Sequence, residues 1–441
     1  MTYEEAIRYL YGLINYEKIN FSYSDLKLER MRELVNRLGN PQNDFPIILV
    51  AGTKGKGSTS YFLERIFLAW GRRCGFYTKP HLLTFRERIR LGGSLIPPAD
   101  LASLVEKVKP VVEEMKNSPW GKPTYFEVSV ALAFLYFSLN KVEIAVVEVG
   151  LGGRLDATNV CEPQLTVITP VSFDHTDILG DTLSAIAREK AGILRRGTKL
   201  ILSPQEKEAR EAILEEAEEK GSPVVEMTKE CQWQILSREK NGSLFSFSVK
   251  NWGEGLSHLS FLGDHQVINL LTALLAVREW GLSFNRQKLE KALENLCWPG
   301  RIQVLSAEPL VIFDVAHNQA SFSQLLDTLT NFLGVEKAVF LLGFLEGKDY
   351  EGIAKQLKGF AYQAFLTSPL NPKAVLPQVV SPYLEKEDVN WEIVKDPFQA
   401  KKLAAQFARD KGLPLVVAGS FYLAKIFAEQ LLLPMEEVKL C

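Results

Sequence analysis

One stretch decides the fold of this chain: Ile47-Ile48-Leu49-Val50-Ala51-Gly52-Thr53-Lys54-Gly55-Lys56-Gly57-Ser58-Thr59. Its first five residues are an unbroken apolar run, which predicts a buried strand of a parallel sheet, and residues 61–70 have helical spacing. Strand, glycine loop and helix in this order are the setting of a phosphate-binding loop, because backbone N–H groups and a helix N-terminus attract phosphate oxygens. We therefore expect Lys56 to reach the β- and γ-phosphates and the Ser58 hydroxyl to hold Mg²⁺.

The loop departs from the strict pattern G-x-x-x-x-G-K-[ST] at two positions. Val50 stands where the first glycine belongs, and Gly57 separates Lys56 from Ser58. The alternative is a glycine turn that binds no ligand. Three glycines and two lysines within residues 52–57 favour nucleotide binding over that alternative.

The length and composition predict a soluble α/β protein with more than one core. A chain of 441 residues is expected to form two or three domains. The expected boundary is Trp298-Pro299-Gly300-Arg301, which divides the chain into domains 1–297 and 298–441. The net charge of −2 gives no indication of a nucleic-acid partner or a membrane surface.

The cysteines and the termini of the sequence indicate a cytoplasmic protein. The five cysteines are scattered without a CxxC pair, which predicts reduced thiols and no zinc site: Cys74, Cys161, Cys231, Cys297 and Cys441. The acidic N-terminus does not have the composition of a signal peptide. No apolar run reaches the ~18 residues that a membrane helix needs.

Other predicted strands deliver polar residues to the edge where ligands bind in open α/β sheets. Glu148 lies near the end of the apolar run 142–149 and is expected to face Mg²⁺ beside the phosphate loop. His175 follows the strand 165–169 and is a candidate ligand of the same metal. A strand-end glutamate and a histidine with structural hydrogen bonds are the alternatives.

The remaining pattern alternates helices with strands. Helices are expected over residues 2–16, 25–39, 98–118, 124–139 and 264–280; Thr124 and Glu127 have capping-box spacing at the start of the fourth. Strands 224–225, 233–236 and 244–249 with an Asn-Gly turn predict an antiparallel patch. Five more strands predict a second, doubly wound domain: 311–314, 338–342, 364–367, 391–394 and 415–419. No GxGxxG is present, so a dinucleotide cofactor is not indicated.

Two further segments are open to more than one interpretation. The glycine-rich run 150–159 is expected to be a functional loop over the site. Arg86, Arg88 and Arg90 form a basic cluster that is either a solvated face or an anion site at a strand end.

In this order along the chain, the motifs resemble the folylpolyglutamate synthase/dihydrofolate synthase branch of the Mur ligases. The resemblance covers nearly the whole chain, and its most specific part is Gly-Leu-Gly-Gly-Arg-Leu-Asp-Ala-Thr-Asn at residues 150–159. The matching motifs are residues 52–58, Pro80-His81-Leu82, 148–159, Asp174-His175-Thr176, 189–193, His265-Gln266 with Asn269, Pro299-Gly300-Arg301 and 314–318.

The resemblance implies an α/β fold and an activity. The fold is an N-terminal P-loop NTPase-like domain, with a mainly parallel sheet and a small antiparallel patch, followed by a C-terminal Rossmann-like α/β domain. The reaction uses ATP to join a folate-type carboxylate, from dihydropteroate or a reduced folate, to the amine of L-glutamate through an acyl phosphate. ATP is the co-substrate, and two Mg²⁺ ions are expected to accompany it. The resemblance also implies a monomer.

The resemblance also implies roles for individual residues. ATP would be bound by Gly55, Lys56, Gly57, Ser58, Asn269, Arg301 and Asp314, and Mg²⁺ by Ser58, Glu148 and His175. Lys56, Lys190 and His317 would be catalytic, with Lys190 carbamylated and His317 near the glutamate site. The folate or pterin would contact Ser24, Asp25, Leu26, Thr124, Tyr125, Phe126, Leu155, Asp156 and Ala157.

Three lysines depart from the family pattern. Lys54 replaces the more usual asparagine of the phosphate loop, Lys79 stands where many relatives carry a serine, and Lys27 replaces a glycine of the pterin loop. The change at Lys79 weakens the expectation of a metal-binding hydroxyl there. The change at Lys27 leaves the preferred folate open.

Four functions therefore compete. The leading one is an enzyme with both activities, which Asp25 in the pterin loop favours, and the next is a folylpolyglutamate synthase alone. A cell-wall Mur ligase is disfavoured because the region before Pro46 is short for a UDP-binding domain. A P-loop ATPase or kinase with a regulatory role would turn over ATP without glutamate.

Overall fold

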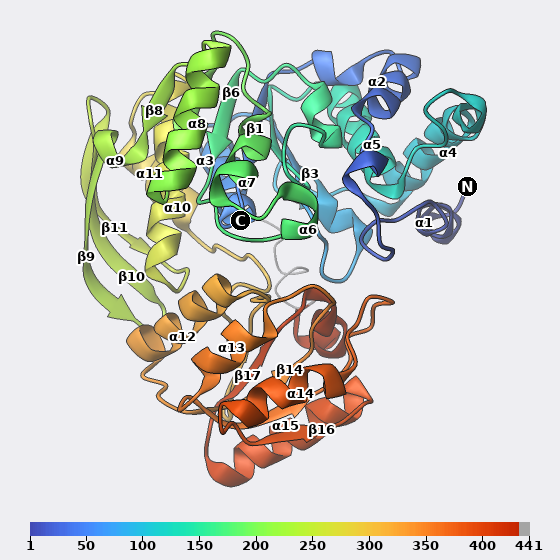
Figure 1. Ribbon diagram of the computed structural model, residues 1–441. Coiled ribbons are helices and arrows are strands. Elements are labelled where there is room, and N and C mark those ends of the chain that lie inside the picture. The colour runs from blue at the N-terminus through green and yellow to red at the C-terminus, as the bar shows by residue number, and fades with distance from the viewer. Residues whose placement is uncertain (432–441) are drawn as a thin grey trace. The chain divides into compact units, whose positions relative to one another are not determined.

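A computed structural model describes residues 1–431 as two compact units (Figure 1). Unit 1 comprises Met1–Gln234, Ser246–Ser257 and Gln266–Glu294, and unit 2 comprises Ile235–Phe245, His258–His265 and the chain from Asn295 onward. The domain boundary between residues 297 and 298 stays a prediction. No helix within residues 1–431 is long and apolar enough to cross a membrane.

Unit 1 is built on an eight-stranded sheet with the order β4-β3-β2-β5-β1-β6-β7-β8. The predicted run before the phosphate loop is its strand β1, whose five residues are all buried. β1 pairs in parallel with β5 and β6, so that Val50 lies opposite Glu148. The strands are β1 Ile47–Ala51, β2 Cys74–Tyr77, β3 Ile89–Leu91, β4 Ser94–Leu95, β5 Ile144–Glu148, β6 Leu165–Ile168, β7 Lys199–Leu202 and β8 Val224–Glu226. β1, β5 and β6 are neighbours, so their carboxyl ends form one continuous edge.

Helices occupy most of the connections along residues 1–293. They are α1 Tyr3–Tyr11, α2 Leu28–Arg37, α3 Lys56–Ala69, α4 Pro98–Glu114, α5 Tyr125–Leu139, α6 Thr176–Leu179, α7 Leu183–Ala191, α8 Lys207–Lys220, α9 Met227–Glu230, α10 Asp264–Glu279 and α11 Arg286–Leu293. The predicted helix 25–39 begins late, because Tyr23–Asp25 forms a separate 3-10 turn. The Asp25 carboxylate closes that turn by accepting hydrogen bonds from the backbone N–H and hydroxyl of Ser22.

The prediction for Val224-Val225 was wrong. These residues belong to β8, which pairs in parallel with β7 in the large sheet. The small sheet contains β9 Cys231–Glu239, β10 Gly242–Val249 and β11 Gly253–Leu259 in the order β11-β10-β9. Two apolar residues have too short a pattern to show which sheet they join.

The arginine cluster is not a solvated face. The Arg88 side chain is 0% exposed and forms an ion pair with Glu17 at 2.8 Å. Arg90 is buried and lies 3.1 Å from the carboxylate of Glu64. Both guanidinium groups therefore neutralise carboxylates of unit 1, and the alternative of an anion site stays a prediction.

Replacing Arg90 by leucine is expected to destabilise the fold by about 3 kcal/mol, because the fully buried Glu64 carboxylate would lose its charge partner. Burial already raises the pKa of Glu64, against the attraction of Arg90. Urea unfolding measures the effect. The control is the double variant Glu64→Met/Arg90→Leu, which removes both charges and should lose less than about 1 kcal/mol. Equal losses in the single and double variants would contradict the prediction.

Unit 2 contains a six-stranded sheet with the order β12-β13-β17-β14-β15-β16. The five predicted strands are β13 Leu310–Phe313, β14 Ala338–Leu342, β15 Ala361–Leu366, β16 Trp391–Ile393 and β17 Leu415–Ala418, and they pair with one another in parallel. The sixth strand, β12 Gln303–Ala307, was not predicted and pairs antiparallel with β13. The helices are α12 Gln319–Leu333, α13 Tyr350–Leu357, α14 Pro377–Lys386 and α15 Pro397–Lys411.

Three of the predicted reduced cysteines, Cys74, Cys161 and Cys231, are buried free thiols. Cys441 lies outside the described residues.

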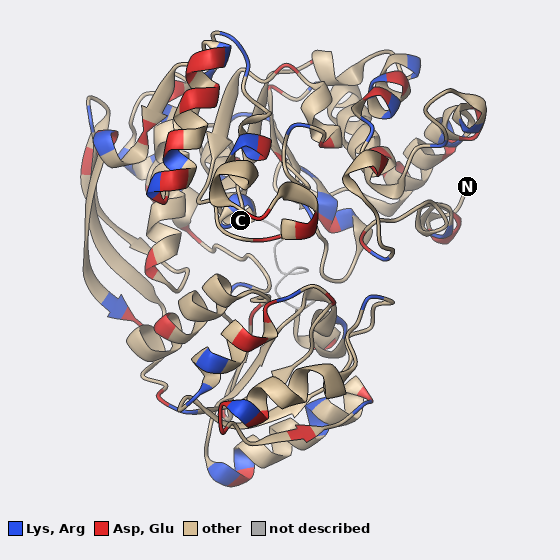
Figure 2. Cartoon of the chain, in the orientation of Figure 1, with Lys and Arg blue, Asp and Glu red and all other residues tan. Residues whose placement is uncertain are grey.

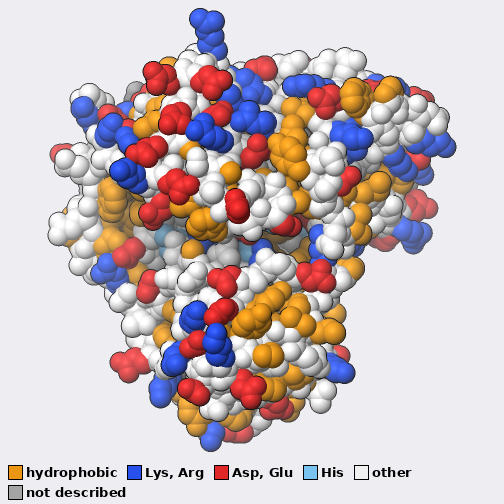
Figure 3. Space-filling view, in the orientation of Figure 1, with side chains coloured by type: hydrophobic (Ala, Val, Ile, Leu, Met, Phe, Trp, Pro, Cys, Tyr) orange, Lys and Arg blue, Asp and Glu red, His pale blue; other side chains and the backbone are white. Residues whose placement is uncertain are grey.

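Charges of both signs are distributed over the chain (Figure 2). On the face that Figure 3 shows, the side chains over α8 are a mixture of acidic and basic groups.

Candidate functional site

The predicted phosphate loop connects β1 to α3, which begins at Lys56. Gly52 and Gly55 have φ values of 138° and 79°, a region that disfavours side chains. A Cβ atom on Gly52 would collide with Thr169, and one on Gly55 would collide with Asn269. Two of the glycines are thus required by the backbone itself, and the loop packs against the end of β6 and against α10.

Two ammonium groups share one carbonyl oxygen of this loop. Lys56 Nζ donates to the Gly52 carbonyl (3.0 Å) and to that of Thr53 (3.3 Å). Lys190 Nζ, which comes from the last turn of α7, donates to the same Gly52 oxygen (3.0 Å). Burial, together with the positive charge of Lys56, lowers the pKa of Lys190 to about 7. This concentration of positive charge favours an anion at the loop.

Lys54 adds a third ammonium group. Its backbone N–H donates to the Pro170 carbonyl (3.1 Å), so the loop is attached to the segment after β6. Its Nζ atom is buried and has no hydrogen-bond partner among the described residues. Burial lowers the pKa of Lys54 to about 8, against the attraction of Asp174. A buried cation without a hydrogen-bond partner is unfavourable by itself, so the position of Lys54 favours a bound anion.

Glu148, a predicted metal ligand, is the last residue of β5 and is buried. Its carboxylate accepts a short hydrogen bond from the Thr78 hydroxyl and a longer one from the backbone N–H of Lys79 (3.4 Å). Sequence reasoning missed Thr78, although a hydroxyl directly after β2 was a usable signal. Lys79 thus contacts Glu148 through its backbone.

The other two predicted metal ligands follow neighbouring strands of the same edge. Ser58 is buried in the first turn of α3, after β1. His175 follows β6, has a left-handed backbone (φ 52°) and a half-exposed ring, and lies 4.0 Å from Asp174. Within residues 1–431, no three or more His, Cys, Asp or Glu side chains are grouped so as to hold a metal ion. The predicted set therefore needs further oxygen ligands from a nucleotide and water.

The remaining predicted ATP residues lie in both units. Asn269 belongs to α10 in unit 1, where its amide nitrogen donates to Gln266 (3.1 Å). In unit 2, the carboxylate of Asp314 directly after β13 accepts hydrogen bonds from the backbone N–H groups of Ile302 (2.8 Å) and Ala316 (2.7 Å). Burial raises the pKa of Asp314, against the attraction of Arg301. The second unit thus gathers Arg301, Asp314 and His317 at the carboxyl end of its first parallel strand.

His317 and Arg301 also have local contacts in unit 2. His317 Nδ1 donates to the Val315 carbonyl (2.8 Å), which fixes the ring. The Arg301 guanidinium lies over the ring of Phe421, 5.7 Å from its centroid. Both side chains are therefore oriented by the fold before any ligand binds.

The three predicted folate segments all belong to unit 1. Ser24 and Asp25 lie within the 3-10 turn Tyr23–Asp25, and Leu26 follows it. In Leu155-Asp156-Ala157, the buried Asp156 accepts hydrogen bonds from the backbone N–H groups of Leu151 (2.8 Å) and Thr158 (3.0 Å), which shapes the loop 150–159. Both aspartates thus organise the backbone of their own loops.

The third segment, Thr124-Tyr125-Phe126, begins α5, and its predicted capping box is confirmed. Glu127 completes the box and also accepts from Arg30 Nε at 2.7 Å. Tyr125 is fully buried beside Arg88, whereas Phe126 is partly exposed. Of this segment's two aromatic rings, the structure therefore leaves Phe126 the more accessible to a ligand.

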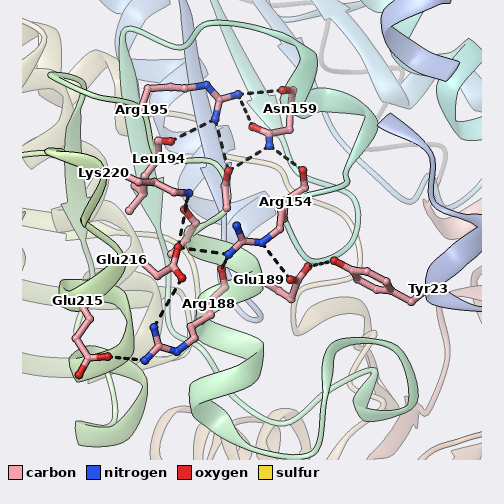
Figure 4. A network of polar contacts seen from close by, with 12 residues as sticks. Tyr23, Arg154, Asn159, Arg188, Glu189, Leu194, Arg195, Glu215, Glu216 and Lys220 are labelled. Carbon is pink, nitrogen blue, oxygen red and sulfur yellow. Dashed lines mark hydrogen bonds and ion pairs between the residues drawn. The ribbon is translucent and has the colours of Figure 1, made fainter. Parts of the chain in front are cut away.

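A polar network connects two of these folate segments to α7 (Figure 4). Glu189 accepts a hydrogen bond from the Tyr23 hydroxyl (3.1 Å) and another from Arg154 Nε (3.3 Å). Sequence reasoning did not name these three residues as site residues, although Tyr23 lies in a loop that it considered as a pocket wall. The signal that was available is their position, since each directly precedes a predicted site residue: Ser24, Leu155 or Lys190.

Known proteins resemble this chain along nearly all of its length. A family model described as the Mur ligase middle domain matches residues 50–277, and one described as the Mur ligase glutamate ligase domain matches residues 300–421. A dihydrofolate synthase/folylpolyglutamate synthase of Bacillus subtilis is 33% identical, over 90% of this chain and 94% of that protein. A folylpolyglutamate synthase of Lacticaseibacillus casei is 30% identical, over 98% of this chain and 99% of that protein.

Solved structures give the same result. The folylpolyglutamate synthase of Mycobacterium tuberculosis complexed with ADP has a TM-score of 0.88 at 28% identity, covering 97% of this chain and 98% of that one. Escherichia coli FolC in complex with DHPP and ADP has a TM-score of 0.81 at 30% identity, covering 97% of each chain.

Proposed function

The chain belongs to the Mur ligase family, in the branch of the dihydrofolate synthases and folylpolyglutamate synthases, and from this premise we propose its reaction. It is an ATP-dependent ligase that adds L-glutamate to folate-type substrates, and we assign it both dihydropteroate and reduced folates as acceptors. One observation carries the chemistry: Lys56 and Lys190 both donate to the Gly52 carbonyl, in the unit that also contains the three predicted folate segments.

The reaction needs an activated carboxylate, because an amine cannot displace oxide from a carboxylate. A carboxylate oxygen attacks the γ-phosphorus of ATP, and the bond from this phosphorus to the β-γ bridging oxygen breaks. ADP departs as the leaving group, and the former carboxylate is now an acyl phosphate. The glutamate amine then attacks the acyl carbon and loses a proton, and inorganic phosphate leaves as the amide forms. The loop N–H groups and Lys56 would hold the phosphates in line and neutralise their charge. Acyl phosphates hydrolyse, so the site must exclude water.

The residues at the sheet edge fit Mg²⁺ as the companion of ATP. Glu148 supplies a carboxylate and Ser58 a hydroxyl, and oxygen ligands of this kind suit Mg²⁺ together with phosphate oxygens. His175 would serve a second ion. When bound, Mg²⁺ would neutralise the charge of the phosphate oxygens.

The surroundings of Lys190 support its carbamylation. With its pKa lowered to about 7, a large fraction of this amine is neutral near neutral pH, and the neutral nitrogen is the form that adds to CO₂ and loses a proton. The carbamate would replace a cation by an anion beside Lys56 and Lys79, the two lysines whose charges disfavour the ammonium form. The repulsion between Lys56 and Lys190 would then become attraction.

An assay of the purified protein with dihydropteroate, ATP, Mg²⁺ and L-glutamate tests the proposal. We expect ADP release that requires both dihydropteroate and glutamate, together with a folate product one glutamate heavier by mass spectrometry. A parallel assay with tetrahydrofolate tests chain extension. Product from tetrahydrofolate alone would restrict the enzyme to polyglutamylation, and phosphate release without glutamate would contradict the ligase.

Replacing Lys54 by methionine is expected to weaken binding of a non-hydrolysable ATP analogue about 10-fold, because a buried ammonium group would lose its phosphate partner. Calorimetric titration measures the effect, and repeating it with ADP shows whether the γ-phosphate is the partner. Lys207→Met is the control, since that side chain is 89% exposed on α8. Unchanged affinity for both nucleotides in Lys54→Met would show that Lys54 has no part in phosphate binding.

A further inference from the structure

Glu189 is the point where two folate segments meet the helix that carries Lys190. Tyr23 opens the 3-10 turn that leads into Ser24, and its hydroxyl donates to Glu189 Oε2. Arg154 directly precedes Leu155, and its Nε donates to Glu189 Oε1. One carboxylate therefore accepts hydrogen bonds from two segments that are far apart in the sequence, as Figure 4 shows.

The neighbouring residue of the helix serves the other substrate. Successive side chains of a helix point about 100° apart, and Lys190 Nζ donates to the Gly52 carbonyl of the phosphate loop. The backbone at this turn is also fixed, because Arg154 N–H donates to the Glu189 carbonyl (2.9 Å) and a Cβ on Gly192 would collide with Arg154. The last turn of α7 thus contacts the residues directly before two folate segments through Glu189, and the phosphate loop through Lys190.

The two hydrogen bonds to Glu189 differ in how firmly their donors are held. Arg154 also donates to Glu216 of α8 (3.3 Å) and to the Arg188 carbonyl (3.2 Å). Tyr23 is 38% exposed, and its hydroxyl is the contact that joins the turn Tyr23–Asp25 to α7 in the network of Figure 4. Burial and the Glu189 charge raise the pKa of Tyr23, so the hydroxyl keeps its proton and donates. A single bond from an accessible side chain can form or break as the folate segment is filled or emptied.

We propose that Tyr23 and Glu189 are positioning residues that couple the folate site to the phosphate loop. A pterin bound against Ser24-Asp25-Leu26 would hold the turn in place, and the Tyr23–Glu189 hydrogen bond would then fix the end of α7 that presents Lys190 to Gly52. Because such coupling is reciprocal, bound nucleotide should increase folate affinity by the same factor as folate increases nucleotide affinity. The inference rests on the proposed function, since it needs a folate at this turn.

Calorimetric titration tests the coupling. The dissociation constant of dihydropteroate is measured with and without a saturating non-hydrolysable ATP analogue. For the wild type we expect the analogue to increase dihydropteroate affinity about 5–10-fold. In Tyr23→Phe this ratio should fall to near 1, while the affinity for the analogue alone stays that of the wild type. Glu189→Ala, which removes the acceptor of the Tyr23 hydroxyl, should lose the coupling as well.

The chain offers a matched control in Tyr9→Phe. The Tyr9 hydroxyl donates to the Glu113 carboxylate (2.9 Å), so this variant removes the same kind of bond between two residues that have no contact with Glu189 in the network of Figure 4. It should keep the wild-type ratio. Wild-type coupling that persists in Tyr23→Phe, or a wild-type ratio of 1, would overturn the inference while glutamate ligation stands. A wild type that forms no glutamate-dependent product would instead contradict the proposed function.

Discussion

Lys56→Ala is expected to lower glutamate-dependent ADP formation on the order of 10³-fold, the effect of removing a main group that stabilises charge in a transition state. Lys56 Nζ lies folded over the phosphate loop on two of its carbonyl oxygens, so a small movement would bring it to a phosphate. Loss of this ammonium group would leave the charge of the transferring phosphoryl group without one of the cations of the phosphate loop. Initial rates of coupled ADP release measure the effect.

Lys207→Ala is the control for this variant, because it removes a lysine exposed on α8. It should retain the wild-type rate. Binding of the ATP analogue to Lys56→Ala separates lost affinity from lost catalysis. Glutamate ligation that continues unchanged in Lys56→Ala would refute the assignment of the loop as the nucleotide site.

Lys190→Ala is expected to lower glutamate-dependent ADP formation on the order of 10³-fold, nearly as much as Lys56→Ala. Short carboxylates such as acetate or propionate should restore part of the activity of Lys190→Ala. Truncation opens a buried space beside the Gly52 carbonyl, and a small carboxylate there would replace the negative charge of a carbamate. Rates measured against carboxylate concentration should rise and saturate. Lys56→Ala is the matched control, since carboxylates should not restore a missing cation.

The pH dependence adds a second measurement on Lys190. The fraction of neutral amine increases as the pH rises through the Lys190 pKa of about 7, so wild-type protein depleted of CO₂ should regain activity faster at pH 8 than at pH 6 when the same concentration of dissolved CO₂ is restored at both pH values. A Lys190→Ala variant with wild-type activity, or one that carboxylates do not rescue, would argue against the modification.

The sequence predicted those features that depend on neighbours along the chain. The run 47–51, the phosphate loop and α3 could be recognised because a buried strand, positive-φ glycines and a helix follow one another within 23 residues, from Ile47 to Ala69. The capping box at Thr124 and the position of Glu148 at the end of a strand could be predicted for the same reason, because each depends only on residues that are close in the sequence. The roles of individual site residues remain predictions that the variants above test.

Only the tertiary structure decided where long side chains and short strands find their partners. Arg88 pairs with Glu17, which lies 71 positions away, and Tyr23 bonds to Glu189, which lies 166 positions away, so no local pattern could show either contact. Val224-Val225 belong to the large sheet because they pair in parallel with the edge of β7. A pattern of two apolar residues does not show which sheet they will join. Spacing along the chain thus determined the helices and strands and the sheet edge at which the strands end. Burial among distant segments determined which charged groups are paired. It also determined which of them, such as the Lys54 ammonium group, have no hydrogen-bond partner among residues 1–431.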